Sequence, residues 1–302
     1  MSMSTQERYA SLAQKKLVRV GSGPGKSRGL WASVREIASQ REMLALLIRR
    51  DLKSRYKDSA LGFVWTLVRP LTQLFIYYVV IGKFLGAERG IPEFAIYVFT
   101  GLTAYGLLSE IIGGSTASIV GNSGLIKKIY LPREVFPLAS VGSALFNFAI
   151  QLVIILLATF AAGSFPATGE IIYFLPGLLV LLVYGTAFGL LLSAVNVYLR
   201  DVQYLVEVLL LLMLWASPIV YSWSMVKGIL GTGWALDIYT SNPITLAVMA
   251  FQRSLWTAGH DVAEYPADMM LRLGISFAVG IVLLLVFHRV FARLQGNFAQ
   301  AL

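Results

Sequence analysis

Six apolar runs, each about 20 residues long, constrain the fold of this chain more than any other feature. A run of that length forms a helix that can cross the hydrocarbon core of a bilayer. The chain is 57% hydrophobic and 14% charged, with a mean hydropathy of +0.71. A soluble domain cannot bury so much apolar surface, so the sequence predicts an all-α membrane protein with six transmembrane helices in residues 61–302. The expected spans are residues 61–83, 94–113, 135–160, 171–195, 204–223 and 268–290.

The distribution of lysine and arginine predicts the orientation of these spans. The net charge is +9, and many of the basic residues precede the first span. Further basic residues, such as Lys127, Arg200 and Arg293, fall in segments that the count of spans places on the same side as the N-terminus. By the positive-inside rule, both termini of this multi-pass protein are expected in the cytoplasm. Residues 1–30 are polar and rich in Gly and Ser, which predicts a flexible cytoplasmic tail.

Residues 31–60 are predicted to form an amphipathic helix that lies on the membrane surface. On a helical wheel, one face is apolar and the other is basic. The apolar face carries Leu44, Ile48, Leu52 and Tyr56, and the basic face carries Arg49, Arg50, Lys53 and Lys57. Arg55 falls among the apolar residues, within reach of Asp51 one turn away. Because a helix that only rests on headgroups has little use for a charge there, Arg55 and the following Leu61-Gly62 break are candidates for a substrate portal.

The region between the last two spans, residues 224–266, does not resemble an ordinary loop. Its apolar stretches, 226–230 and 244–256, are too short to span a bilayer and are interrupted by Gly and Pro. Such segments predict short re-entrant or interfacial helices on the outer side of the membrane.

The loop of residues 122–134, between the second and third spans, predicts a docking element on the inner side. It holds a short amphipathic segment, Leu125–Tyr130, which follows a polar Asn-Ser-Gly cluster and is stopped by Pro132. A short rigid helix on an inner loop can dock on a partner protein. It can also simply rest on lipid headgroups, and the pattern alone leaves both interpretations open.

Charged and polar residues within the spans suggest a transport path. Arg69, Glu110 and Glu207 are expected at similar depth near the cytoplasmic side, where they either form an ion-paired ring at a portal or reach out to headgroups. Polar residues at helical spacing mark one stripe on the first span and one on the fifth; they are Thr66, Arg69, Gln73 and Tyr77, and Glu207, Ser217 and Tyr221. Such stripes line either a polar conduit or a contact between helices.

Several kinds of chemistry are disfavoured by the sequence. The segment Gly21–Ser27 lacks the first glycine of a P-loop, because Val20 occupies that position, so the chain is expected to carry no ATPase of its own. There is no cysteine, and only two histidines, so no metal site, bound cofactor or catalytic site is expected. Gly185 and Gly189 form a GxxxG pair, which predicts close helix packing within the monomer.

An ordered set of motifs gives the chain a family resemblance. The motifs are Arg50-Asp-Leu-Lys-Ser-Arg-Tyr56, Asn122 to Lys127, Leu131-Pro-Arg-Glu-Val-Phe-Pro137, Asn196-Val-Tyr-Leu-Arg-Asp-Val202, Ser217-Pro-Ile-Val-Tyr221 and Asn242-Pro-Ile-Thr245. From about residue 40 onward, the chain resembles the transmembrane permease of type-2 ABC exporters that export polysaccharide, such as O-antigen, teichoic acid or cell-wall galactan. The N-terminal tail is longer than this resemblance leads us to expect.

The resemblance implies partners and roles. The permease would be a homodimer in the bacterial inner or plasma membrane, bound to two separate ATPase subunits that hold ATP and Mg²⁺, and it would move a polysaccharide linked to a polyprenyl pyrophosphate. Residues 31–60 would be the interface helix, and 224–266 the outer gate. Contacts with the ATPase would come from Asn122, Leu125, Ile126, Lys127, Lys128, Tyr130, Pro132, Arg133, Glu134, Arg200 and Asp201. The portal and path would include Arg55, Leu61, Gly62, Arg69, Gln73, Tyr77, Glu207 and Tyr221, with Arg69 a candidate contact for phosphate.

Other functions remain open at this level. A drug or lipid permease of similar architecture fits the same periodicity. An ion-coupled secondary transporter is disfavoured, because no acidic residue lies near the centre of a span. A membrane enzyme acting on lipid-linked sugars would have to use the scattered polar residues of the outer side, which are Asp237, His260, Asp261 and Glu264.

Overall fold

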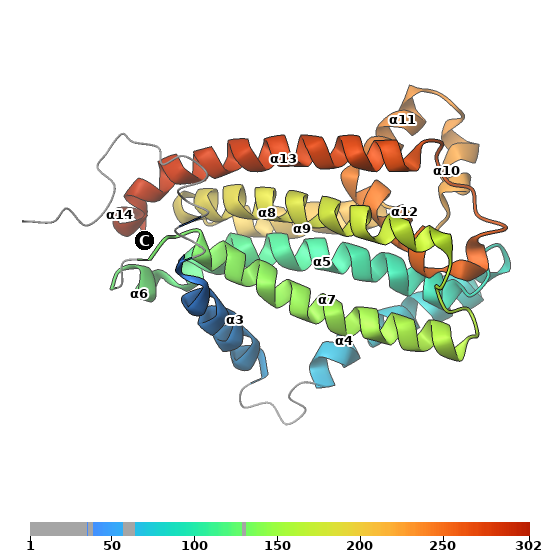
Figure 1. Ribbon diagram of the computed structural model, residues 1–302, viewed down its shortest axis with the longest axis horizontal. Helices are drawn as coiled ribbons and strands as arrows, with labels where there is room; N and C mark the ends of the chain where they lie inside the picture. The colour runs from blue at the N-terminus through green and yellow to red at the C-terminus, as the bar shows by residue number, and fades with distance from the viewer. Residues whose placement is uncertain (1–34, 36–38, 57–63, 129–130) are drawn as a thin grey trace, which may run out of the picture.

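Long helices run side by side through the length of the molecule (Figure 1). The computed structural model describes residue 35 and residues 39–56, 64–128 and 131–302. Four helices in this part of the chain are long and apolar enough to cross a membrane. They are α5 (Phe94–Gly121), α7 (Val135–Ala161), α8 (Phe174–Tyr198), which continues the short helix η4 (Gly169–Tyr173), and α13 (Met269–Leu294).

Helix α5 is the centre of the bundle. It packs against α7 on one side and α8 on another, and α8 in turn packs against α13. Along the most apolar stretch of α5, 67% of the residues are buried, whereas the figure for α13 is 17%. A helix that is apolar all round can be buried in protein or face lipid, and only its place in the bundle decides between the two.

The GxxxG pair of α8 packs against α5, so the prediction of packing within the monomer is confirmed. A β-carbon at Gly185 would lie 2.9 Å from Ile111 Cγ2, and one at Gly189 would lie 2.8 Å from the Cβ and Oγ atoms of Ser115. The two helices can therefore approach this closely only because the pair has no side chains.

Replacing Gly189 with alanine should destabilise the protein by about 1–3 kcal/mol, because the added methyl group overpacks the α5–α8 contact. Gly113→Ala is the matched control, since no atom lies within 4 Å of a β-carbon built at Gly113. Alanine favours the helix over glycine by up to about 1 kcal/mol, so this control should keep or slightly raise stability. Thermal unfolding of the two purified variants in detergent checks the prediction, and equal melting temperatures would contradict it.

The first and fifth expected spans differ from the prediction. The first consists of α4 (Trp65–Ile76), which contains Pro70, followed directly by a π-helical stretch, η2 (Tyr77–Phe84). The fifth, expected over 204–223, is helical only over α9 (Val202–Trp215) and ends where the Ser217-Pro218 segment begins. The second, expected to end at 113, continues as α5 to Gly121. The boundaries shifted because apolar length and helical length need not coincide.

The two ends of the bundle carry different elements (Figure 1). At one end lie α3 (Arg41–Tyr56), α6 (Ser123–Ile126), η6 (Gln295–Asn297), α14 (Phe298–Ala301) and the C-terminus. At the other end lie α10 (Trp223–Leu230), α11 (Trp234–Ser241) and α12 (Pro243–Leu255). Helix α12 is not a surface helix. All but one of its residues from Thr245 to Leu255 are buried, and it packs against α8 and α5.

Candidate functional site

Helix α3 packs one face on the protein, and within residues 31–60 the structure describes a helix over Arg41–Tyr56, so its place on a membrane surface stays a prediction. Its Leu47 is only 4% exposed and joins a core cluster with residues of α7 and α8. A β-carbon added at Gly142 of α7 would overlap the side chain of Ile48. The basic face is as expected, with Arg49, Arg50 and Lys53 exposed. The apolar face of α3 therefore packs against α7, and the basic side chains of α3 stay exposed.

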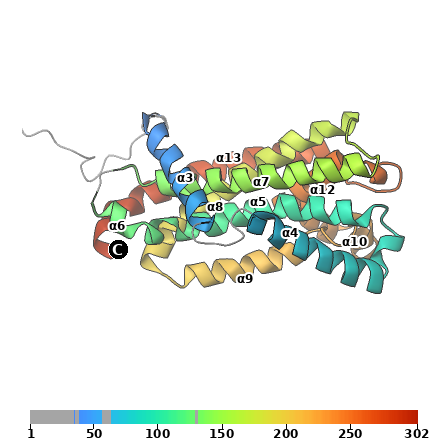
Figure 2. The same ribbon diagram turned by 90° about the horizontal axis from the view of Figure 1, so that it is seen from below.

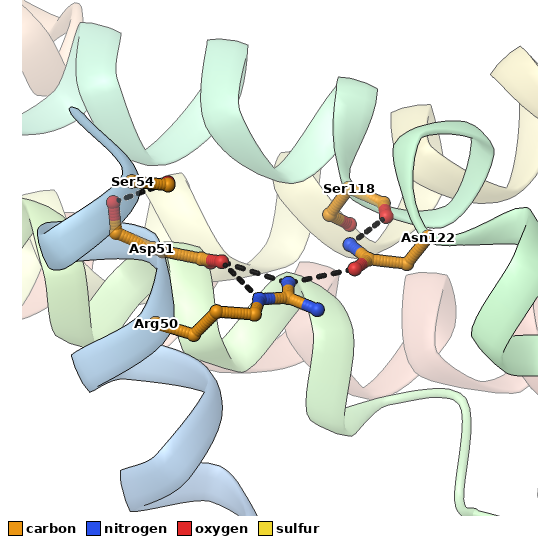
Figure 3. Close-up of polar contacts among 5 residues, drawn as sticks. All are labelled: Arg50, Asp51, Ser54, Ser118 and Asn122. Atoms are coloured by element: carbon orange, nitrogen blue, oxygen red, sulfur yellow. Dashed lines mark hydrogen bonds and ion pairs between the residues drawn. The ribbon is translucent and has the colours of Figure 1, made fainter. Parts of the chain in front are cut away.

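Arg50 joins α3 to the end of α5 (Figure 3). Its Nη2 atom donates to Asn122 Oδ1 at 2.7 Å and to Asp51 Oδ1 at 2.8 Å. The Asn122 amide donates in turn to the Ser118 carbonyl at 2.7 Å, so its orientation is set by α5 itself. Charged donors make the stronger hydrogen bonds of proteins. The guanidinium therefore holds the basic helix against the segment that opens the predicted docking loop.

The docking loop begins with one turn of helix, α6. The Asn122 carbonyl accepts from the amides of Leu125 and Ile126, and α6 ends at Ile126 rather than continuing to Tyr130 as expected. Ile126 is buried in the same core cluster as Leu47, while Lys127 and Lys128 are exposed. The buried Ile126 anchors this turn in the core, and the two exposed lysines give it a basic surface.

The remaining loop residues surround this turn. Pro132 and Arg133 are half-buried, and Glu134 is buried where α7 begins. Arg200 and Asp201 are exposed in the turn between α8 and α9. This end of the structure thus presents α3, α6 and the 200–201 turn together.

The expected polar stripe on the fifth span is wrong. Since α9 ends at Trp215, Tyr221 is not part of that helix, and its hydroxyl donates back to the Trp215 carbonyl at 2.8 Å. Ser217 is fully buried and donates to the Met213 carbonyl. Glu207 is exposed on the side of α9. Tyr221 thus completes the end of α9 instead of continuing a stripe along it.

Of the residues of the expected path, Tyr77 contacts the end of α9. Gln73 is exposed, and the ring of Tyr77 contacts Trp215 edge-on, with 6.2 Å between the ring centroids. Glu110 is half-buried and accepts a hydrogen bond from Asn147 Nδ2 at 2.7 Å. Figure 2 shows α9 along one edge of the bundle. Most of α9 is exposed, and only Val206 is buried.

Sequence reasoning missed the side chains that hold the break after α9. Tyr97 of α5 donates to the carbonyls of Pro218 and Tyr221, at 3.0 and 2.8 Å, and Gln252 of α12 donates to the Pro218 carbonyl at 2.8 Å. Because backbone carbonyls that are removed from water need hydrogen-bond partners, these two side chains stabilise the unwound segment. Both lie in apolar runs without any local signal that distinguishes them from packing residues.

Comparison with known proteins places this arrangement in a family. The family model described as ABC-2 type transporter matches residues 42–256. The chain is 29% identical over 269 residues to the O-antigen export system permease protein RfbA of Myxococcus xanthus, which covers 89% of this chain and 98% of that protein. The permease of the same name from Klebsiella pneumoniae is 27% identical over 262 residues, with 86% and 95% covered. The polysialic acid transport protein KpsM of Escherichia coli is 22% identical over 174 residues, 57% of this chain.

The family match extends over well more than half of the chain. The chain belongs to the ABC-2 type transporter family. As an ABC-2 transporter it is a multi-pass membrane protein, and the resemblance inferred from its motifs is confirmed. The matched stretch runs from the start of α3 to the residue after α12, so it contains both the Arg50–Asn122 contact and the break after α9.

Some predicted site residues of this ABC-2 transporter stay untested. Leu61, Gly62 and Tyr130 lie outside the described residues, as do the side chains of Arg55 and Arg69. The portal formed by Arg55, the Leu61-Gly62 break and Arg69 therefore remains a prediction, and so does the ion-paired ring of Arg69, Glu110 and Glu207. Among the described residues, no three His, Asp or Glu side chains come together as metal ligands.

Proposed function

We propose that this chain is the membrane-spanning subunit of an ATP-driven exporter of lipid-linked polysaccharide. The observation that carries the proposal is the similarity to an O-antigen export permease over 98% of that protein's length. The joined basic surface of α3 and α6 supports it, because it offers a preformed place for a separate ATPase to dock. ATP and Mg²⁺ would be held by that partner subunit and not by this chain.

The same proposal includes the topology. Six spans would place the end with α3, α6 and the C-terminus in the cytoplasm, because that end carries Lys127, Lys128 and Arg200 among other basic residues. The four long helices would be complemented by α4 with η2 and by the short α9. Helices α10 to α12 would then form the outer gate region.

We expect the working assembly to contain two copies of the permease and two of the ATPase. The exposed side of α4 and α9 supports a homodimer, because it carries large apolar side chains, including Leu71, Phe75, Leu205 and Leu209. Unpartnered apolar helices in a bilayer meet lipid or another protein. A path between two copies of this face would be bordered by Gln73, Tyr77 and Glu207, with Arg69 placed to meet the pyrophosphate.

Co-purification and transport test this function. The permease expressed with the ABC ATPase of the same transport system should purify with it in a one-to-one ratio. Inverted vesicles should move a labelled polyprenyl-linked polysaccharide only when ATP is present. Charge reversal of the exposed pair, K127E with K128E, should release the ATPase. An ATPase surface that binds these lysines would carry negative charge, and the introduced glutamates would repel it. A permease that moves the substrate without any ATPase, driven by an ion gradient, would contradict the proposal.

A further inference from the structure

The last nine residues of the chain contact both loops of the candidate docking surface. We call residues 294–302 the C-terminal clasp; it comprises the end of α13, the η6 turn and α14. Figure 1 shows α14 at the same end of the bundle as α6 and α3. No motif singled out this segment in the sequence, and it lies outside the stretch matched by the family model.

The clasp is bound to the base of the docking loop. Arg133 Nη1 donates to the Gln295 carbonyl at 2.7 Å, and Gln295 Nε2 donates to Glu134 Oε1 at 3.2 Å. Glu134 is only 5% exposed, and its Oε1 atom also lies 3.9 Å from His288 Nε2 of α13. A buried carboxylate needs such partners, because leaving it without them costs several times the energy that an ordinary hydrogen bond contributes.

The clasp is also bound to the end of α8. Tyr198, two residues before the turn of Arg200 and Asp201, donates its hydroxyl hydrogen to the Leu294 carbonyl at 2.8 Å. Phe298 is fully buried, with its ring 6.1 Å from that of Tyr198 and 5.8 Å from that of Phe291. The Arg133 guanidinium lies 5.9 Å from the same Phe298 ring. Phe298 is therefore a shared contact of both loops.

Two adjacent carbonyls of the clasp thus accept hydrogen bonds from two separate segments, the 122–134 loop and the end of α8, which leads into the 200–201 turn. The Gln295 carbonyl also accepts from the Phe298 amide within η6, so the Arg133 contact is an additional one that comes from outside the clasp. The Tyr198 hydroxyl donates to the carbonyl of Leu294, and the Arg133 guanidinium donates to that of Gln295. The clasp cannot keep both hydrogen bonds if one loop moves without the other.

We infer that the C-terminal clasp is a positioning element, which holds the 122–134 loop and the 200–201 turn as one unit so that motion of the ATPase reaches both together. This inference rests on the proposed function of the two loops. Gln295 and Phe298 are the residues that carry it, and neither would touch ATP or the transported substrate.

The test uses the full permease–ATPase complex in lipid nanodiscs. The chain has no cysteine, so Gly124→Cys and Leu199→Cys introduce two unique positions for spin labels, one in the 122–134 loop and one beside the 200–201 turn. Both residues are exposed, no atom lies within 4 Å of a β-carbon built at Gly124, and neither residue is among the expected ATPase contacts. The variants are Phe298→Ala and Gln295→Ala. Asn297→Ala is the matched control, because it removes an exposed side chain from the same turn. Phe298→Leu keeps an apolar side chain and should restore much of what Phe298→Ala loses.

We expect a narrow distance distribution between the labels in the parent and in Asn297→Ala, and a broad one in Phe298→Ala. Gln295→Ala should broaden it less, because the contact through the Gln295 carbonyl remains. Export per ATP hydrolysed should fall about tenfold in Phe298→Ala, the factor expected for losing one or two stabilising contacts, while the ATPase stays bound.

Two results would overturn the inference. One is a distribution that stays narrow in both Phe298→Ala and Gln295→Ala. The other is a loss of export in those variants without any change in the distance. Failure of the proposed function would look different, since the unsubstituted parent would then fail to bind the ATPase or to export.

Discussion

Replacing Arg50 with alanine should lower polysaccharide export about fivefold to tenfold while leaving the permease folded. The guanidinium is the link between α3 and Asn122, with 2.7 Å between Nη2 and Oδ1. A hydrogen bond from a charged donor contributes about 1.5–3 kcal/mol, but the Arg50 side chain is 46% exposed, so a value near 1 kcal/mol is appropriate. Without the link, α3 and the docking loop can respond to the ATPase separately. ATP-dependent export in vesicles measures the loss.

Arg49→Ala is the control for this substitution. Arg49 is the preceding residue and carries the same charge, and its side chain is exposed as well. It removes one positive charge from the basic face without touching Asn122, so export should fall less than twofold. Equal losses in the two variants would show that the charge of the helix matters and the contact with Asn122 does not. Asn122→Ala should reproduce the effect of Arg50→Ala, and the double variant should add little to either.

Replacing Phe251 with alanine should destabilise the permease by about 3 kcal/mol. Phe251 of α12 is fully buried, and its ring contacts those of Phe148 and Phe174, with centroids 5.8 and 5.0 Å away. In soluble cores such a truncation costs about 3–5 kcal/mol. The lower end applies here, because lipid is as apolar as the core and only the lost packing counts. Thermal unfolding in detergent, followed by size-exclusion chromatography, measures the change.

Phe160→Ala is the matched control, since Phe160 is 73% exposed at the end of α7. Its removal should change the melting temperature little. Equal melting temperatures of Phe251→Ala and Phe160→Ala would show that the packing of Phe251 does not hold α12 in the bundle. Phe251→Leu should recover part of the lost stability, because leucine refills much of the space.

Elements with a local cause could be predicted from the sequence. Helices α5, α7, α8 and α13 follow from long apolar runs, because apolar length alone specifies a helix that can cross a bilayer. The contact of Gly185 and Gly189 with another helix follows from the absence of side chains at the spacing of one helical turn. The helical segments of residues 224–266 were also expected, although the burial of α12 was not, since a short apolar run does not show what it packs against.

Contacts between distant segments could not be predicted in this way. Arg50 and Asn122 are 72 residues apart in the chain, and the local sequence around either residue does not predict that the two side chains meet. The stripe through Glu207, Ser217 and Tyr221 failed because helical spacing was continued past Trp215, where the helix ends. Gln295 and Phe298 fall in an undistinguished C-terminal segment, and only their partners in α7 and α8 give them a role.

By itself, the sequence determined that this protein is a helical membrane protein of the type-2 ABC permease kind, because apolar length, loop charge and ordered motifs are properties of the linear chain. The tertiary structure decided which helix lies at the centre, that α3 packs on α7, that Arg50 contacts Asn122, and that the C-terminal clasp contacts both the 122–134 loop and the end of α8. These features depend on side chains that meet only after folding, and their energies come from contacts that no local pattern encodes.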